Sequence, residues 1–264
     1  YGRREMMAMN MVKKGIFGKI IHCKGGYLHD LREEIAGGKE NRHYRLRNYI
    51  HRNAENYPTH ELGPIAQILN INRGNRMLTL TSTVSKAEGL REYLSDSTSA
   101  FAQGDVVNTV IKCAGGETIL LTLNTTLPRF YSRDFTVWGT KGMYEEATDS
   151  VFLDKIDAAY DFKWKEKWGN AAEYEKDYEH PTWKKFLAEG IKGSHDGMDW
   201  LEFEAFFDSV RNHRPCPIDV YDAAAWMSVT ALAEESIALG GHPVAIPDFT
   251  NGKWILAGEN REYA

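Results

Sequence analysis

The sequence predicts an α+β fold, with an open, mostly antiparallel β-sheet covered by helices. Strand-like alternation gathers in the middle of the chain, where two pairs of such segments flank short turn sequences. Apolar residues at helical spacing dominate near both ends. Strands and helices segregated along the chain in this way are typical of α+β domains. With 264 residues, 42% of them hydrophobic, we expect residues 1–264 to form a single domain with a real core.

The first third of the chain contains one helix, one strand and one long irregular segment. Arg3 to Lys14 predicts a helix that ends at Gly15, because glycine is favoured just after a helix. Lys19 to Gly26 predicts a strand. Residues 30–56 are rich in Arg, Asn, Gly and His and show no clear period. We expect a long irregular excursion there, which is uncommon unless it has a function.

The next segments alternate between helix and strand. Leucines, an isoleucine and an alanine at helical spacing predict a helix over residues 59–70. Arg76 to Val84 alternates like a half-buried strand. The four residues from Ser85 to Glu88 have the pattern of a capping box, which predicts a helix from there to about Leu94.

Two hairpins are predicted in the middle of the chain. In the first, strands at Val106–Ala114 and Thr118–Thr125 flank Gly115-Gly116, a strong turn signal. In the second, strands at Phe135–Gly139 and Gly142–Ala147 flank Thr140-Lys141. Sequential hairpins of this kind make the predicted sheet mostly antiparallel.

The last hundred residues are predicted to be helical. From about Tyr160 the composition shifts to Trp, Lys and Glu, and we expect short helices. Met198 to His213 is amphipathic, and its apolar side chains are expected in the core: Trp200, Leu201, Phe203, Phe206, Phe207 and Val210. Asp219 to Leu239 predicts the last long helix, which ends at Gly240-Gly241.

Charge and composition narrow the class of partner. The net charge of −5 and the pI near 6.0 argue against nucleic-acid binding, which normally needs a basic face. No apolar run reaches the roughly 18 residues that a membrane-spanning helix requires. Cys23, Cys113 and Cys216 form no CxxC pair, and we expect Cys23 and Cys113 to be small buried hydrophobic residues.

A tyrosine and a histidine three residues apart form the most informative local pattern. Pro58 disfavours helical geometry at Tyr57 and can itself begin the first turn, so Tyr57 lies at the start of a helix. His60 then projects from the same helix N-terminus, where the backbone dipole disfavours a protonated imidazole. The pair is either a proton-transfer site or a structural tyrosine beside a capping histidine.

Three further polar clusters have two interpretations each. Residues 42–47 place three arginines near aromatic rings, which suits the binding of hydroxyls, an acetamido carbonyl or phosphate, or forms a solvated loop. Residues 129–133 place Tyr131 between two arginines at a strand end, either in a site or packed on a hairpin. Residues 194–199 precede a helix, so His195 reaches a site or Asp196 merely caps the helix.

Several common catalytic and cofactor patterns are missing from the sequence. There is no GxSxG nucleophile motif and no HxH or HExxH spacing, so we expect no metal site. No glycine-rich G-x-G-x-x-G turn lies between a strand and a helix, so no Rossmann domain is predicted within this chain. A catalytic carboxylate pair cannot be selected from 37 acidic residues by sequence alone.

Taken together, the motifs resemble one known family. The segments that carry this resemblance are residues 3–7, residues 15–20, the Tyr-Pro-Thr-His segment at 57–60, residues 131–133, residues 139–142, His195 with residues 197–199, and residues 247–254. In order and over nearly the whole chain they resemble the C-terminal region of the glucose–fructose oxidoreductase/inositol dehydrogenase (Gfo/Idh/MocA) family, in its glycoside hydrolase family 109 branch of NAD-dependent α-N-acetylgalactosaminidases.

The resemblance implies an unusual hydrolysis with retention of configuration. A tightly held NAD oxidises the sugar 3-hydroxyl, which acidifies the proton at C2; the aglycone is then eliminated, water adds, and the cofactor returns the hydride. By this resemblance His60, Tyr57 and Tyr131 are the acid/base candidates. Arg45 and, more weakly, His195 are the substrate-binding candidates. The partner implied is a small carbohydrate, and the open sheet implies a homo-oligomer.

The sequence also departs from the family pattern. Glu61 and Asp196 stand where the family more often has small residues, and we expect both near the site, where they would alter substrate choice. Nothing here corresponds to the Rossmann domain with which family members begin, so we expect a fragment of a two-domain protein. Relatives are often exported bacterial proteins, but the compartment of this one is not readable. A plain NAD(P)-dependent sugar oxidoreductase and a non-catalytic sugar-binding or oligomerisation module remain alternatives.

Overall fold

One eight-stranded mixed sheet organises the molecule. The computed structural model describes residues 1–95, 100–157 and 162–255. The strand order is β7-β6-β5-β1-β4-β3-β2-β8, in which β1 and β4 are parallel and the other neighbours are antiparallel. The strands are β1 (Ile20–Leu28), β2 (Met77–Val84), β3 (Val106–Cys113), β4 (Thr118–Asn124), β5 (Thr136–Gly139), β6 (Gly142–Glu145), β7 (Ser150–Leu153) and β8 (Val244–Ala245). The predicted open, mostly antiparallel α+β fold is confirmed.

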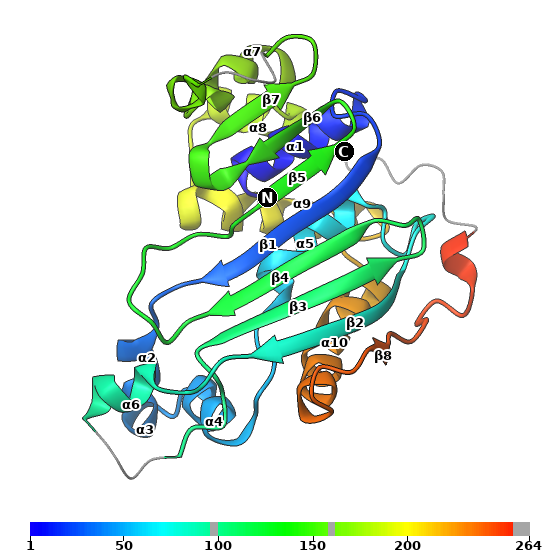
Figure 1. Cartoon of the computed structure of the whole chain (residues 1–264). Coiled ribbons are helices and arrows are strands. Elements are labelled where there is room, and N and C mark those ends of the chain that lie inside the picture. Colours follow the sequence, from blue (N-terminus) through cyan, green and yellow to red (C-terminus); the bar gives the residue numbers. More distant parts are fainter. Residues whose placement is uncertain (96–99, 158–161, 256–264) are drawn as a thin grey trace.

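Helices cover one face of this sheet. Figure 1 shows α5 and α10 behind the strands, while the other face of the sheet points toward the viewer. The helices are α1 (Arg3–Lys13), α2 (Arg32–Ala36), α3 (Gly38–Asn41), α4 (Tyr44–His51), α5 (Pro58–Ile68), α6 (Gly89–Leu94), α7 (Glu175–Tyr178), α8 (Pro181–Glu189), α9 (Met198–Asn212) and α10 (Val220–Ala238). The short helices expected from about Tyr160 are found from residue 164 onward, and Tyr160 itself lies outside the described residues.

The main core lies between the sheet and the helices α1, α5 and α10. Alternate residues of β3 and β4 point into it, as period-two strands require, and Ile111 and Ile119 are completely buried. Leu62 and Ile65 contribute the apolar face of α5. Trp226 of α10 packs in the same cluster. This burial anchors α5 firmly, so its first turn is a rigid support.

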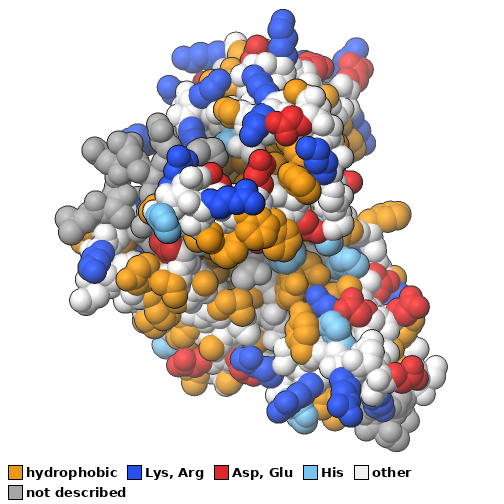
Figure 2. All heavy atoms as spheres, turned by 180° about the vertical axis from the view of Figure 1, so that it is seen from behind, with side chains coloured by type: hydrophobic (Ala, Val, Ile, Leu, Met, Phe, Trp, Pro, Cys, Tyr) orange, Lys and Arg blue, Asp and Glu red, His pale blue; other side chains and the backbone are white. Residues whose placement is uncertain are grey.

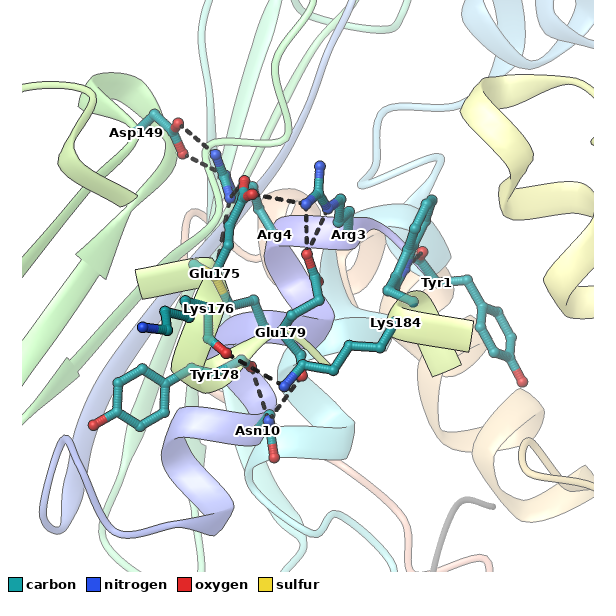
Figure 3. Close-up of polar contacts among 12 residues, drawn as sticks. Tyr1, Arg3, Arg4, Asn10, Asp149, Glu175, Lys176, Tyr178, Glu179 and Lys184 are labelled. Carbon is teal, nitrogen blue, oxygen red and sulfur yellow. Dashed lines mark hydrogen bonds and ion pairs between the residues drawn. The ribbon is translucent and has the colours of Figure 1, made fainter. Parts of the chain in front are cut away.

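Ion pairs attach α1 to the turn before β7 and to the chain around helix α7. Arg3 pairs with Glu175 at 2.8 Å and with Glu179 at 2.6 Å. Arg4 pairs with Glu175 at 2.6 Å and with Asp149 at 3.0 Å (Figure 3). Because several partly buried charges share partners, this network orients α1 more strongly than isolated surface pairs would.

The prediction for α9 is wrong in one respect. The helix forms, but of its apolar side chains only Leu201 is buried, whereas Trp200, Phe203, Phe206, Phe207 and Val210 are 44–59% exposed. Leu201 packs with Trp183 and Phe186 of α8 in a small separate cluster. Figure 2 shows hydrophobic side chains gathered across the helix-bearing side of the molecule. Periodicity indicated an amphipathic helix, but it does not say what covers the apolar face.

Other segments also differ from the predictions. Residues 30–56 are not irregular, because α2, α3 and α4 lie within them. The predicted capping box is wrong: α6 begins at Gly89, and the Asp105 carboxylate accepts hydrogen bonds from the backbone N–H groups of Glu88 and Gly89. Both hairpins are confirmed, and β7 adds a strand that was not predicted.

Cys23 and Cys113 are buried in the core as expected, and burial raises the pKa of both thiols. No helix within the described ranges is long and apolar enough to cross a lipid bilayer.

Candidate functional site

Tyr57 and His60 lie together where α5 begins. Tyr57 occupies the N-cap position with non-helical backbone angles, and Pro58 is the first helical residue. The phenol and imidazole ring centroids are 4.6 Å apart. Pro64, one turn further along, has no N–H to donate to the carbonyl of His60, its usual helical partner. The predicted placement of both rings at one helix N-terminus is confirmed.

Arg45 of α4 lies against this pair. Its guanidinium carbon is 5.1 Å from the centre of the Tyr57 ring. The same guanidinium pairs with Glu34 and donates to the Tyr27 hydroxyl at 3.4 Å. Arg45 is buried, whereas Arg42 and Arg47 of the same predicted cluster are exposed. The structure therefore selects one arginine of the three for the site.

Tyr27 belongs to this cluster and was missed in the sequence. Its ring lies 4.3 Å from Tyr57 and 5.2 Å from His60, between centroids. Burial raises the pKa of Tyr27 to about 12, and the Arg45 charge opposes this only in part. The predicted strand ended at Gly26, but β1 continues to Leu28, which places Tyr27 at its carboxyl end. A strand prediction extended by two residues would have found it.

Tyr131 lies at the exposed edge of the cluster. Its ring is 5.2 Å from the ring of His29, which in turn is 6.0 Å from Tyr27. Arg133 donates to the Tyr131 hydroxyl at 3.0 Å and pairs with Glu5 at 3.2 Å. Tyr131 is 52% exposed, and residues 128–132 line an open depression of about 600 Å³. The rings of His29 and Tyr27 thus connect Tyr131 to the Tyr57–His60 pair.

His195 is, with Tyr131, one of the two exposed residues among the five predicted. Its side chain is 73% exposed, and its Nδ1 lies 2.9 Å from an oxygen of Asp199. The alternative role of Asp196 as a helix cap is wrong, because Gly197 occupies the N-cap of α9 and no side chain caps it. His195 is near enough to His60 to affect its protonation, so it lies toward the site rather than in it.

His60 is neutral at physiological pH. Burial, the positive charges of Arg133 and Arg45, and to a smaller extent the nearby His195 together lower the pKa of His60 to about 4. The helix N-terminus favours the neutral ring as well, but burial and the surrounding cations are the larger causes. A neutral imidazole with a free lone pair can accept a proton.

Glu61 lies near the site, as predicted, because it follows His60 in the first turn of α5. Its side chain, however, is completely buried between α5 and the sheet. A carboxyl group in that position cannot contact a sugar. Asp196, the other departure from the family pattern, is exposed beside His195.

Neither a metal centre nor a dinucleotide cradle is formed by the residues that the structure describes. They contain no group of three His, Cys, Asp or Glu side chains that could hold a metal ion. Gly15 and Gly18 adopt positive φ, but they follow helix α1 rather than a strand. Binding of a pyrophosphate needs a glycine-rich turn between a strand and a helix. The described residues therefore form no glycine-rich turn of this kind.

The fold is shared with the C-terminal part of NADH-dependent sugar and inositol dehydrogenases. A levoglucosan dehydrogenase in complex with NADH and levoglucosan superposes with a TM-score of 0.64 at 15% identity, over 94% of this chain and 64% of that one. Scyllo-inositol dehydrogenase from Lactobacillus casei, with bound NAD(H) and scyllo-inositol, superposes with a TM-score of 0.54 at 12% identity, over 92% of this chain and 61% of that one. At such low identity these likenesses establish the fold alone.

Sequence comparison identifies the family within that fold. The model of the glycosyl hydrolase 109 C-terminal domain matches residues 1–256. A glycosyl hydrolase family 109 protein of Parabacteroides distasonis is 37% identical, over 97% of this chain and 59% of its own length. An α-N-acetylgalactosaminidase of Shewanella oneidensis is 38% identical, over 96% of this chain and 57% of its own length. The chain belongs to glycoside hydrolase family 109, and it spans about three fifths of the length of these relatives.

Proposed function

We propose that this chain is the substrate-binding and catalytic domain of an NAD-dependent α-N-acetylgalactosaminidase that cleaves with retention of configuration. The observation that carries the proposal is the cluster of Tyr57, His60 and Arg45 on a rigid helix start, in a chain whose relatives include proteins named α-N-acetylgalactosaminidase. The family's hydrolysis needs groups that move protons rather than a pair of carboxylates. This cluster offers a phenol and a neutral imidazole.

The nicotinamide, held by residues outside this chain, would supply the reversible oxidation at C3 that makes the C2 proton acidic. The side chains of this chain would do the rest. His60 would accept a proton from the sugar, from the 3-hydroxyl or from C2, because its ring is neutral at working pH. Tyr57, stacked near His60 and the Arg45 guanidinium, would donate or orient a hydrogen bond to the same sugar. Proton transfer of this kind typically contributes about 10²–10⁴-fold in rate.

The other predicted residues would act at the edge. Tyr131, with its hydroxyl held by Arg133, would serve as the second acid/base group. Arg45 is already paired with Glu34, so it would present only its remaining N–H groups to a hydroxyl or an acetamido carbonyl. His195, mostly exposed, would contact only a part of the substrate that extends out of the site.

A sugar oxidoreductase is the second candidate, favoured by the fold shared with NADH-dependent dehydrogenases. Full-length protein separates the two: the proposal expects release of the aglycone from an aryl α-N-acetylgalactosaminide without net NADH formation. Stoichiometric NADH release with no aglycone would favour the oxidoreductase. His60→Ala should abolish aglycone release, and near-normal turnover would refute the role of His60. His213→Ala is the matched control, because this histidine lies exposed at the end of α9 and should not affect turnover.

The oligomer is a separate expectation. Val110 and Trp138 are 48% and 43% exposed on strands β3 and β5 of the open sheet. We propose that this sheet face mediates self-association, and sedimentation of Val110→Glu against the unmodified chain would test it. A loss of the dimer would support the proposal, and an unmodified chain that is monomeric at all concentrations would refute it.

A further inference from the structure

Two acidic side chains meet inside the molecule, directly behind the candidate site. Glu61, next to His60 in the first turn of α5, is 1% exposed, and Glu55, in the segment that leads into this helix, is 0% exposed. Their carboxyl groups are close enough to share a hydrogen bond. Acids are almost never fully buried unless they are paired with a cation. No lysine, arginine or histidine among the described residues pairs with either one.

The surroundings offer these acids little compensation. Both oxygens of Glu61 and one oxygen of Glu55 lack a well-formed hydrogen bond within the part of the chain that the structure describes. The backbone amides of Tyr27 in β1 and Thr122 in β4 lie near the Glu61 carboxyl. Burial and, to a smaller extent, the charge of Glu55 raise the pKa of the Tyr49 phenol of α4, whose hydroxyl hydrogen-bonds Thr125. Of these neighbours only the Tyr49 phenol can itself carry a charge, and it would be a negative one.

A shared proton is the chemical solution to this arrangement. An ionised carboxylate only accepts hydrogen bonds, so two carboxylates repel each other, whereas a carboxylic acid donates to a carboxylate. Burial raises the pKa of Glu55 to about 7, and burial together with the charge of Glu55 raises the pKa of Glu61 well above its usual range. Near neutral pH the pair therefore keeps at least one proton.

The pair is tied to the two residues that the proposed function uses. The Glu55 carboxylate accepts a hydrogen bond from the backbone N–H of Tyr57 at 3.2 Å. Glu61 follows His60 directly, and its backbone carbonyl lies so near Gly25 that an added Cβ would be 2.5 Å away. A force that separates the two carboxyl groups therefore moves the helix start on one side and the Tyr57 backbone on the other.

We propose that Glu55 and Glu61 are positioning residues: a proton-sharing carboxyl pair that joins the approach segment to the first turn of α5 and so sets the geometry of Tyr57 and His60. This positioning role rests on the proposed function, since it concerns the same two residues, but the measurements that test it do not require that function. Loss of the shared proton at high pH leaves two buried negative charges, which push the segment away from the helix. The geometry of Tyr57 and His60 is thus kept only at pH values at which the carboxyl pair retains its shared proton.

The first measurement asks whether the proton is there. Infrared spectra of the 264-residue chain should show a protonated-carboxyl C=O band near neutral pH, and the double variant Glu55→Gln, Glu61→Gln should lack it. Glutamine keeps the shape and supplies an N–H donor, so it imitates the protonated acid. The variant Glu179→Gln is the matched control, because Glu179 is a buried acid that pairs with Arg3 instead. A band absent from the unmodified chain, or retained in the double variant, overturns the proposal.

The second measurement asks whether the pair positions the site. Ring resonances of His60 should shift in the unmodified chain as the pH rises from about 6 to about 9, where a neutral His60 no longer titrates. Glu61→Gln should abolish that shift while keeping the resonances near their low-pH positions, and Glu55→Gln provides the same test if the first variant does not fold. If these acids had only a structural role, glutamine would not both keep the His60 resonances at their low-pH positions and remove their shift with pH. Unmoved resonances in the unmodified chain, or an unchanged response in both variants, overturn the positioning role. Neither readout needs substrate or NAD, so failure of the proposed glycosidase activity leaves both results intact.

Discussion

The contact between Gly25 and α5 makes a strong prediction about what holds the candidate site in place. A Cβ added at Gly25 would lie 2.5 Å from the carbonyl oxygen of Glu61 and 3.0 Å from a methyl carbon of Ile65. The first atom belongs to backbone, which cannot rotate away, so Gly25→Ala must push α5 off strand β1. Overpacking of this kind costs about 1–3 kcal/mol. Alanine restricts the unfolded chain more than glycine and offsets up to about 1 kcal/mol of that loss.

We therefore expect Gly25→Ala to lower the free energy of unfolding by roughly 1–2 kcal/mol. For a chain of this size each kcal/mol lowers the melting temperature by about 2–4 °C. Urea titration and thermal melting would measure both quantities. Because the displaced helix carries His60, the ring resonances of His60 should also move, which a loss of stability alone would not cause.

Gly63→Ala in the same helix is the control. An added Cβ there would lie 3.4 Å from the ring of Trp226, an ordinary contact. Alanine is the better helix former, so this variant should be unchanged or more stable by about 0.5–1 kcal/mol. If Gly25→Ala is as stable as Gly63→Ala and leaves the His60 resonances in place, the close packing of α5 on β1 is not what positions the site.

Three further predictions follow from buried and exposed side chains. Asp222→Asn should lower the free energy of unfolding by about 1.5–3 kcal/mol, because it removes the nearer carboxylate, 2.7 Å from the buried Arg73 guanidinium, and leaves Asp219 at 3.7 Å; a loss below about 1 kcal/mol in urea titration would contradict this. Leu201→Ala should cost about 2–5 kcal/mol and Phe203→Ala less than about 1, because only the leucine is buried; equal losses would show that the exposed face of α9 is covered in solution. NMR should show that His60 titrates near pH 4. Because its folded-state pKa is lowered, its contribution to stability is present above pH 6.5 and is lost as the pH falls through about 4. A titration midpoint at or above pH 6.5 would refute the burial of His60.

Local signals were sufficient for the helix that carries the site. Pro58 and the apolar spacing after it predicted where α5 begins, and the structure places Tyr57 at its N-cap. The Gly115-Gly116 turn predicted the β3–β4 hairpin for the same reason, since the preference of glycine for positive φ acts within a few residues. Such signals depend on neighbours in sequence and need no knowledge of the fold.

Segments without a period were predicted poorly. The helices α2, α3 and α4 have five, four and eight residues, too short to be stable without tertiary contacts. The Ser85–Glu88 pattern indicated a cap that Asp105, from a distant part of the chain, supplies instead. In both cases the deciding contact comes from outside the window that a sequence pattern covers.

The sequence by itself determined the class of fold, the family resemblance, and the placement of Tyr57 and His60 at one helix start. Only the tertiary structure decided the charge of His60, because burial and the cations Arg133 and Arg45 come from other elements. It also decided that Glu61 turns inward to meet Glu55 rather than outward to a sugar. Hydrophobic spacing states which residues can be buried together, whereas the free energy of a charge depends on every group around it in space.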